Sequence, residues 1–322
     1  HSITSLDFDD LGQFLILSAV DRLLQLYDVH KGRYLSSIQL QKYGAHMAKF
    51  THAGRSCLYA SAPPASASIS EVDNLIRLLS LDTKSYLRYF KGHKEQVLCL
   101  EVHPVHDQFI SSSLDRLVKT WDVRTASATG SIDVGAASIV AYDPMGVVFA
   151  VVRFPSPSES SFGGKAVLEL YDVANCDVRP FLVLKFAISS SNTYQTGSLH
   201  CTKVEFSNNG KHILVCSNSD HYVLDAFTGE LVCTVPGQDY TNLKYLTSGL
   251  ATFSPDGTHL LVGGSRGVRL FNLDDAIRSS ESNWLQSFKT IQGDDEAKIV
   301  SFNPKLLTFA TANTVVNLWQ PE

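Results

Sequence analysis

Seven stretches of alternating hydrophobic and polar residues each lead into a tight turn, and a more uniformly apolar stretch follows every turn. Alternation with a period of two places successive side chains on opposite faces of a β-strand. Pro at the second place of such a turn presets φ, and Gly at the fourth accepts a positive φ. Two of the seven turns lack the Gly, so the pattern is statistical. The turns are Asp9–Gly12, Thr51–Gly54, His103–His106, Asp143–Gly146, Ser207–Gly210, Ser254–Gly257 and Asn303–Leu306.

The turns begin 40 to 64 residues apart, and a second landmark follows each of them 16 to 28 residues later. This landmark is an aromatic or large apolar residue, usually followed by a polar one. A period in the forties suits four short strands per propeller blade. The landmarks are Tyr27-Asp28, Leu79-Ser80, Trp121-Asp122, Tyr171-Asp172, Leu224-Asp225, Phe271-Asn272 and Trp319-Gln320. Together the two landmarks resemble those of WD-repeat proteins, which implies an all-β, seven-bladed WD-repeat β-propeller. We expect residues 1–322 to form it as a single domain.

Blades two and four are longer than the others. Their turns and aromatic landmarks are 28 residues apart, against 16 to 18 in the other blades. The additional residues are Pro- and Ser-rich insertions at 62–72 and 153–166, between the second and third strands of their blades. Loops at that position emerge on the same face of a propeller as the connections between blades. Long loops on a rigid scaffold often carry binding residues, whereas their composition is also typical of disordered decoration, and both interpretations stay open.

The last blade lacks room for four strands. Its strands are expected near Ala297–Phe302, Leu307–Ala312 and Thr314–Trp319, after which the chain stops. In the WD-repeat family the strand before the first blade completes the last one, and here it would lie upstream of His1. The sequence therefore predicts a last blade that lacks one strand.

Blade three carries the whole repeat signature in Gly92-His93, Ser111, Asp115 and Trp121. In WD-repeat proteins a His, Ser, Asp and Trp at these places form a hydrogen-bonded set that joins three strands. Buried polar groups need such partners. The alternative interpretation is a Ser-His-Asp catalytic triad, which is recognised by geometry rather than by composition. We expect a structural role for the four side chains.

Composition excludes several other kinds of protein. A net charge of −5 and a pI near 6.1 argue against a broad grip on nucleic-acid phosphates. The six cysteines include no CxxC pair, so we expect neither a metal nor a cofactor, although His46, His52 and Cys57 could in principle hold an ion. No membrane-spanning stretch or signal peptide is evident. The inner strands look small or apolar, so we do not expect an enzyme.

Several longer stretches resemble one family of WD-repeat proteins, the fungal Swd-two family with its animal counterpart WD-repeat protein eighty-two. They lie at residues 42–53, 86–93, 141–150, 205–211, 225–229 and 302–305. The resemblance implies a nuclear, non-catalytic subunit of COMPASS, the histone H3 lysine-4 methyltransferase complex. It implies binding to the N-terminal region of the methyltransferase, which supports the stability of that subunit or its recruitment to transcribed chromatin. The alternative that it leaves open is a subunit of the cleavage and polyadenylation factor, acting in RNA 3′-end processing and transcription termination.

Two of these stretches carry the residues that we expect to contact a partner. They are Lys42, Tyr43 and His46 in one stretch and Arg88 and Tyr89 in the other, and we expect them on the loop-rich face. Arg88 also belongs to a basic run with interleaved tyrosines, which suits an acidic or phosphorylated peptide. A solvated outer strand explains the same run without any partner.

Overall fold

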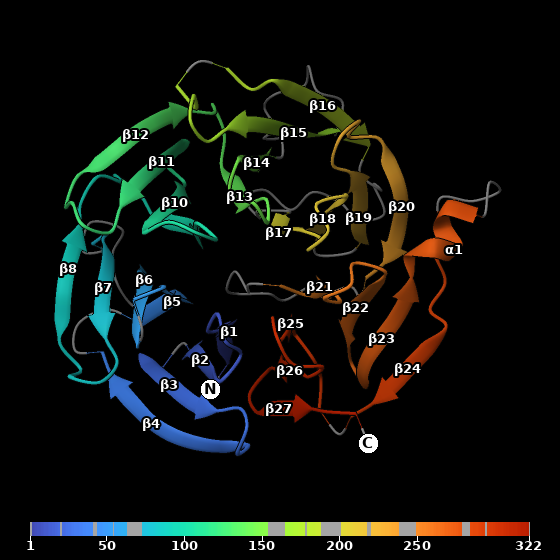
Figure 1. Ribbon diagram of the computed structural model, residues 1–322, viewed down its shortest axis with the longest axis horizontal. Helices are drawn as coiled ribbons and strands as arrows, with labels where there is room; N and C mark the ends of the chain where they lie inside the picture. Colours follow the sequence, from blue (N-terminus) through green and yellow to red (C-terminus); the bar gives the residue numbers. More distant parts are fainter. Residues whose placement is uncertain are drawn as a thin grey trace.

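The chain forms a ring of seven antiparallel β-sheets, the blades, around a central channel (Figure 1). The computed structural model describes residues 2–19, 21–40, 44–53, 55–62, 73–153, 165–177, 179–187, 201–217, 220–237, 249–278, 284–293 and 295–321. In each sheet the strands follow one another in chain order, from the innermost strand at the channel to the outermost at the rim. The seven-bladed propeller that the repeat predicts is therefore confirmed.

The first four blades have four strands each in the described residues. Blade one contains β1 (Ile3–Phe8), β2 (Phe14–Ala19), β3 (Leu23–Asp28) and β4 (Arg33–Gln39). Blade two contains β5 (Gly44–Phe50), β6 (Ser56–Ala62), β7 (Ile76–Ser80) and β8 (Tyr86–Phe90). Blade three contains β9 (Val97–Val102), β10 (Gln108–Ser113), β11 (Leu117–Asp122) and β12 (Ala128–Asp133). Blade four contains β13 (Ser138–Tyr142), β14 (Val148–Arg153), β15 (Lys165–Asp172) and β16 (Leu182–Ala187).

The remaining three blades depart from this scheme in two places. Blade five contains β17 (Cys201–Phe206), β18 (His212–Ser217), β19 (Asp220–Asp225) and β20 (Leu231–Pro236). Blade six contains β21 (Ala251–Phe253), β22 (His259–Gly264), β23 (Gly267–Asn272) and β24 (Lys289–Gln292), with a helix, α1 (Leu273–Arg278), before β24. Blade seven contains β25 (Ile299–Phe302), β26 (Phe309–Ala312) and β27 (Val316–Trp319). The helix was not expected from the repeat. No helix in the described ranges is long and apolar enough to cross a membrane.

The last blade has three strands among the described residues, as the sequence predicts. The ring closes by contact between this blade and the first one. The amide of Ile3 on β1 donates a hydrogen bond to the carbonyl of Asn313, at 2.7 Å. Apolar residues of β1 and β2 also share one buried cluster with Ile299, Ala310 and Ala312 of blade seven.

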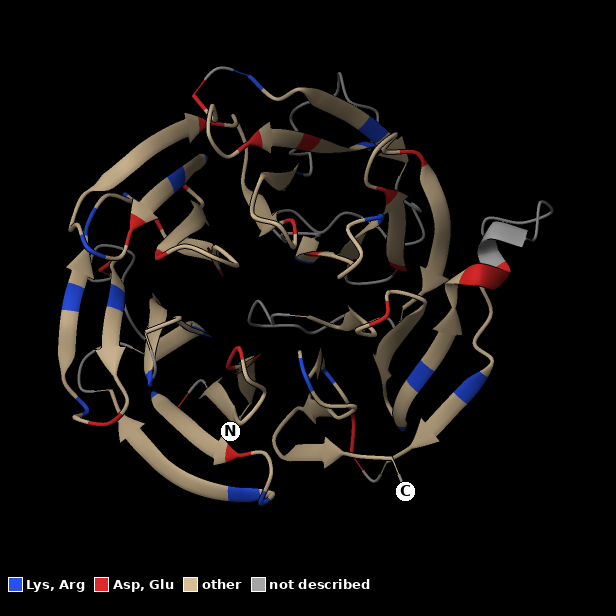
Figure 2. Cartoon of the chain, viewed as in Figure 1, with Lys and Arg blue, Asp and Glu red and all other residues tan. Residues whose placement is uncertain are grey.

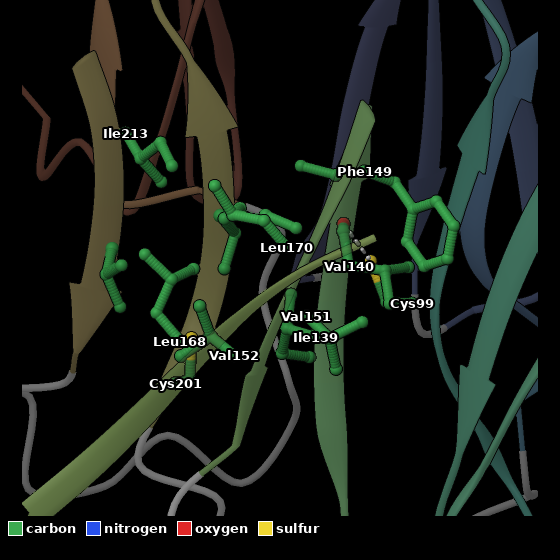
Figure 3. Close-up of a cluster of buried hydrophobic side chains, with 14 of the residues drawn as sticks. Cys99, Ile139, Val140, Phe149, Val151, Val152, Leu168, Leu170, Cys201 and Ile213 are labelled. Atoms are coloured by element: carbon green, nitrogen blue, oxygen red, sulfur yellow. Dashed lines mark hydrogen bonds between the residues drawn. The ribbon is translucent and has the colours of Figure 1, made fainter. Parts of the chain in front are cut away.

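Neighbouring blades adhere through their apolar faces. The largest cluster joins blades three, four and five, where Phe149, Val151 and Leu168 are each fully buried (Figure 3). The strands that contribute to this cluster are apolar on both faces, because each blade lies between two others. The thiol of Cys99 on β9 reaches across to the carbonyl of Val140 on β13, at 3.3 Å. Hydrophobic burial between blades, rather than any one contact, holds the ring together.

A second set of contacts links the turns between first and second strands of neighbouring blades. His103 Nδ1 accepts hydrogen bonds from the amides of Val105 and His106 in its own turn, so its Nε2–H donates to the carbonyl of Gly146 in the next blade, at 3.0 Å. Asn303 does the same in blade seven, with its side-chain amide donating to the carbonyl of Gly12 at 2.8 Å. Gly12 and Gly146 are therefore required for close approach as well as for their positive φ.

We expect Gly146→Ala to lower the free energy of unfolding by about 2 to 4 kcal/mol. The residue has a φ of 70°, and a Cβ atom there would lie 2.3 Å from the His103 ring. Gly135→Ala is the matched control, because Gly135 has a φ of 74° and nothing within 4 Å of the added atom. It should cost only about 1 kcal/mol, from backbone strain alone. Urea denaturation of both variants checks this, and equal losses would show that the contact with His103 contributes nothing.

Candidate functional site

The four signature residues of blade three form one continuous hydrogen-bonded chain. Trp121 Nε1–H donates to Ser111 Oγ at 2.8 Å, and Ser111 Oγ lies 2.8 Å from His93 Nε2. His93 Nδ1 lies 3.0 Å from the Asp115 carboxylate. If Nδ1 carries the proton, Ser111 donates to Nε2 and every polar atom in the chain has a partner. The set spans the loop before β9, the second strand β10, the turn after it and the third strand β11.

The order Asp115–His93–Ser111 matches the connectivity of a catalytic triad, but the surroundings do not suit catalysis. Ser111 is 0% exposed and Trp121 only 1% exposed, so no substrate reaches the hydroxyl. Its oxygen also accepts a hydrogen bond from Trp121, which a nucleophile would have to give up. The geometry is that of a structural tie between strands.

The charges in this set follow from its burial. Burial lowers the pKa of His93, against the opposing effect of Asp115, so the imidazole is held neutral. Burial alone would raise the pKa of Asp115, but hydrogen bonds from the Lys94 amide and from His93 outweigh it and lower that pKa. A neutral histidine beside an ionised carboxylate fits the donor–acceptor order above.

The central channel contains charged side chains, which differs from the expectation that its inner strands are small or apolar. Lys49 of β5 lies 3.4 Å from Asp7 of β1 and 3.1 Å from Glu101 of β9. On the opposite wall, Lys203 and Glu205 of β17 are 2.7 Å apart, and Thr252 of β21 donates to Glu205 at 3.0 Å. Several of these charged residues occupy the second-last place of their inner strand, as in Asp7-Phe8 and Lys49-Phe50. Their neighbours in sequence are apolar, so the strands look apolar when judged by composition.

The channel widens at one end into a cavity of about 280 Å³. Lys49, Glu101, Lys203 and Glu205 line it, together with Pro104, Pro144, Pro255 and Pro304 of the turns between first and second strands. Burial raises the pKa of Asp7 deeper in the channel to about 6, although Lys49 and the Phe50 amide act in the opposite direction. Burial opposes the charge of Lys49, but Glu101 and Asp7 outweigh it and raise its pKa. The lysine therefore remains charged and ties three blades together.

Of the five predicted partner-contact residues, the three that the structure describes do not share one surface. Lys42 and Tyr43 lie outside the described residues. His46 is only 4% exposed, within β5. Its placement on a partner-facing surface is therefore corrected: the inner strand turns this side chain into the packed interior. Arg88 and Tyr89 are on β8, the outermost strand of blade two, rather than on the loop-rich face. The insertions fall almost entirely outside the described residues, within 63–72 and 154–164.

Tyr89 belongs to an aromatic cluster that the sequence did not reveal. The Arg77 guanidinium on β7 lies between Tyr59 and Tyr89, 5.9 and 5.7 Å from the two ring centres. Tyr86 packs against Tyr89 at 5.5 Å and meets the Tyr59 hydroxyl at 3.1 Å. Cation–π contacts of this kind stabilise a buried arginine. Arg88 instead donates a hydrogen bond to the carbonyl of Arg124 in blade three.

His52 and Cys57, which were considered for a metal site, make different contacts in the structure. His52 bridges Asp10, at 2.6 Å, and the carbonyl of His103, also at 2.6 Å, whereas Cys57 is fully buried in β6. Within the described ranges there is no group of three or more His, Cys, Asp or Glu side chains that could hold a metal ion. The contacts of His52 make it part of the links between turns.

Sequence similarity to known proteins identifies the family of this chain. The family described as "WD domain, G-beta repeat" matches residues 84–122, the segment that contains the whole blade-three set. COMPASS component SWD2 of Saccharomyces cerevisiae is 34% identical over 320 residues, which cover 98% of this chain and 90% of that protein. Set1 complex component swd2 of Schizosaccharomyces pombe is 30% identical, covering 98% and 92%. WD repeat-containing protein 82 of Drosophila melanogaster is 33% identical, covering 99% and 90%. The chain therefore belongs to the WD-repeat protein family that includes COMPASS component SWD2 and WD repeat-containing protein 82.

Proposed function

We propose that this chain acts as a non-catalytic scaffold subunit of a histone H3 lysine-4 methyltransferase complex of the COMPASS type. The observation that carries the proposal is similarity over nearly the full length to two yeast proteins named as components of COMPASS and of the Set1 complex. The propeller supports it as a single rigid domain, because a ring of packed blades offers broad surfaces for other subunits. In this role it binds the N-terminal region of the methyltransferase and supports the stability of that subunit or its recruitment to transcribed chromatin.

The described side chains support a binding role over a catalytic one. The one constellation with triad connectivity among them has its hydroxyl fully buried, and the channel charges are paired with one another. Fold alone does not assign function, so the proposal rests on the similarity together with these site features. We expect the protein in the nucleus, and a fluorescent fusion would show it.

Affinity purification of the tagged natural protein from its own cells tests the scaffold role. We expect mass spectrometry to recover the methyltransferase and further COMPASS subunits at comparable amounts. Tagged Trp121→Ala, which should be poorly folded, is the control for adventitious recovery. If only cleavage and polyadenylation subunits are recovered, the protein serves RNA 3′-end processing instead. Recovery of neither set would contradict both assignments.

A further inference from the structure

Two faces of the ring differ in the kind of loops they carry. We call the side with the turns between first and second strands, and between third and fourth strands, the turn face. The opposite side carries the ends of the second strands, the starts of the third strands and the described connections between blades. The 280 Å³ cavity opens among the prolines of the turn face. It is therefore distinct from the loop-rich face on which the sequence pattern places partner contacts.

The turn face exposes large apolar side chains where polar ones are usual. The third place of a tight turn favours Asn, Asp or Gly. Blades five and six follow this rule with Asn209 and Asp256. Blades one, three and four instead carry Leu11, Val105 and Met145, which are 61%, 63% and 73% exposed. These side chains add nothing to the core, so folding does not explain them.

The exposed apolar residues belong to two pairs of touching turns, and Pro104, Pro144 and Pro304 of these turns line the cavity. In one pair the turns of blades three and four touch through His103 and Gly146, and these turns carry Val105 and Met145. In the other pair the turns of blades seven and one touch through Asn303 and Gly12. There Leu11 and Leu307, the latter 67% exposed, add the second apolar patch.

The charge on this face is acidic. The described turns between first and second strands contain five aspartates and three basic residues. They are Asp9, Asp10, Asp107, Asp143 and Asp256 against Arg55, Lys211 and Lys305. The channel adds three carboxylates, Asp7, Glu101 and Glu205, and two ammonium groups, Lys49 and Lys203. Acidic residues also end β3, β11 and β15 on this side, visible at their arrow tips in Figure 2. Two of them are paired on the same face, Asp28 with Lys31 at 3.3 Å and Asp122 with Arg124 at 2.6 Å.

We propose that the turn face docks an extended, basic segment of a partner protein, with an Arg or Lys side chain entering the channel mouth beside Glu101. Apolar side chains before and after that residue pack on the two apolar patches. Glu101 is suited to the contact because it lines the cavity and its side chain is 25% exposed, so its carboxylate can accept another donor besides Lys49, which lies 3.1 Å from Oε1. Apolar anchors around a charge-complementary centre are the usual composition of a peptide site. The inference deepens the scaffold role and rests on it.

Site-specific photo-crosslinking in the natural full-length protein tests this surface. p-Benzoylphenylalanine is introduced at Val105 or Met145 on the turn face, and at Leu114, which is 40% exposed in a turn of the opposite face. We expect crosslinks at residues 105 and 145 to the same partner segment, which mass spectrometry reads as net basic with apolar neighbours. Crosslinks only at residue 114, or to an acidic segment, would overturn the proposal.

Two matched substitutions identify the contacts. Glu101→Gln removes a carboxylate paired with Lys49 at 3.1 Å and should lower the crosslink yield at residue 145 at least fivefold. Glu296→Gln removes one paired with Lys298 at 3.3 Å on the opposite face and should leave the yield unchanged. Leu11→Asn with Val105→Asn, read at residue 145, should also lower it, and asparagine suits these turns. Unchanged yield in Glu101→Gln and in the double asparagine variant would overturn the proposal.

The outcomes separate this inference from the proposed function. A basic segment crosslinked at residue 145 that belongs to a protein outside COMPASS would support the docking surface and contradict the methyltransferase assignment. Recovery of COMPASS subunits without crosslinks at residues 105 and 145 would support the assignment and reject the surface.

Discussion

Trp121→Ala is expected to lower the free energy of unfolding by about 3 to 5 kcal/mol, the largest effect of any single substitution proposed for this chain. The indole is 1% exposed and stacks on Phe109, with ring centres 5.8 Å apart. It also packs edge-on against Phe90 at 5.9 Å. Its removal leaves a cavity between three strands and takes a hydrogen-bond donor from Ser111. Urea denaturation followed by tryptophan fluorescence or circular dichroism measures the loss.

Two further variants separate the contributions of packing and hydrogen bonding. Trp121→Phe keeps a ring against Phe109 but removes the donor to Ser111, so we expect a loss of about 1 to 2 kcal/mol. Phe227→Ala is the exposed aromatic control. That ring is 77% exposed, and its loss should change stability by less than about 0.5 kcal/mol. A loss in Trp121→Ala no larger than in Phe227→Ala would contradict the structural role of blade three's signature.

Acidification from pH 7 to pH 5 is expected to destabilise the fold by about 2 kcal/mol for each of two buried histidines. Burial lowers the pKa of His46 to about 4. Burial, with a smaller effect of Arg269, lowers that of His221 to about 3. Both folded-state values lie below the ordinary value of 6.5, so the unfolded chain takes up protons first. The stability they contribute is complete above pH 6.5 and is lost as the pH falls toward 4 for His46 and toward 3 for His221.

Asp7 acts in the opposite direction. Its pKa is raised from 3.8 to about 6, so the folded state favours the protonated carboxyl. The stability from this group is present below pH 3.8 and is lost as the pH rises through 6. Acidification to pH 5 therefore regains roughly 1 kcal/mol, and the net loss should be about 3 kcal/mol.

Substitution of the two histidines tests the cause of this loss. His46→Leu and His221→Leu each remove one titrating group. Neither Nε2 of His46 nor Nδ1 of His221 has a hydrogen-bond partner in the described part of the chain. Each variant should flatten the dependence of unfolding free energy on pH between 7 and 5 by about 2 kcal/mol, whatever its stability at pH 7. Exposed His30→Asn serves as the control. An unchanged slope in both leucine variants would show that other groups cause the acid loss.

Local chemistry was sufficient for the architecture. Alternation, turn residues such as Asp143-Pro144 and the spacing to aromatic landmarks predicted seven blades, and the shortened last blade followed from counting strands. These features depend on neighbours in sequence, since strand faces alternate and turns need particular φ values. Blade three's signature residues could also be named in advance, because they recur at fixed places in the repeat.

The contacts between blades could not be predicted from the local sequence pattern. The helix α1 interrupts blade six, where the repeat leads directly from β23 to β24. His46 was expected on the loop-rich face because it belongs to a stretch that resembles the Swd-two family, yet the ring buries it within an inner strand. The cluster of Arg77 with Tyr59 and Tyr89 depends on three strands being paired side by side.

The sequence by itself determined the number of blades, their strand order and the residues of the blade-three set, because each depends on short-range periodicity. Tertiary structure alone decided which side chains meet across blades. Only the packing of consecutive blades places Asp7, Lys49 and Glu101 together, although 42 and 52 residues separate them in sequence. Their attraction depends on distance in space and on burial in a narrow channel, neither of which a one-dimensional pattern carries. The same holds for the acidic, partly apolar turn face, whose residues come from separate repeats and share a surface only after the ring has formed.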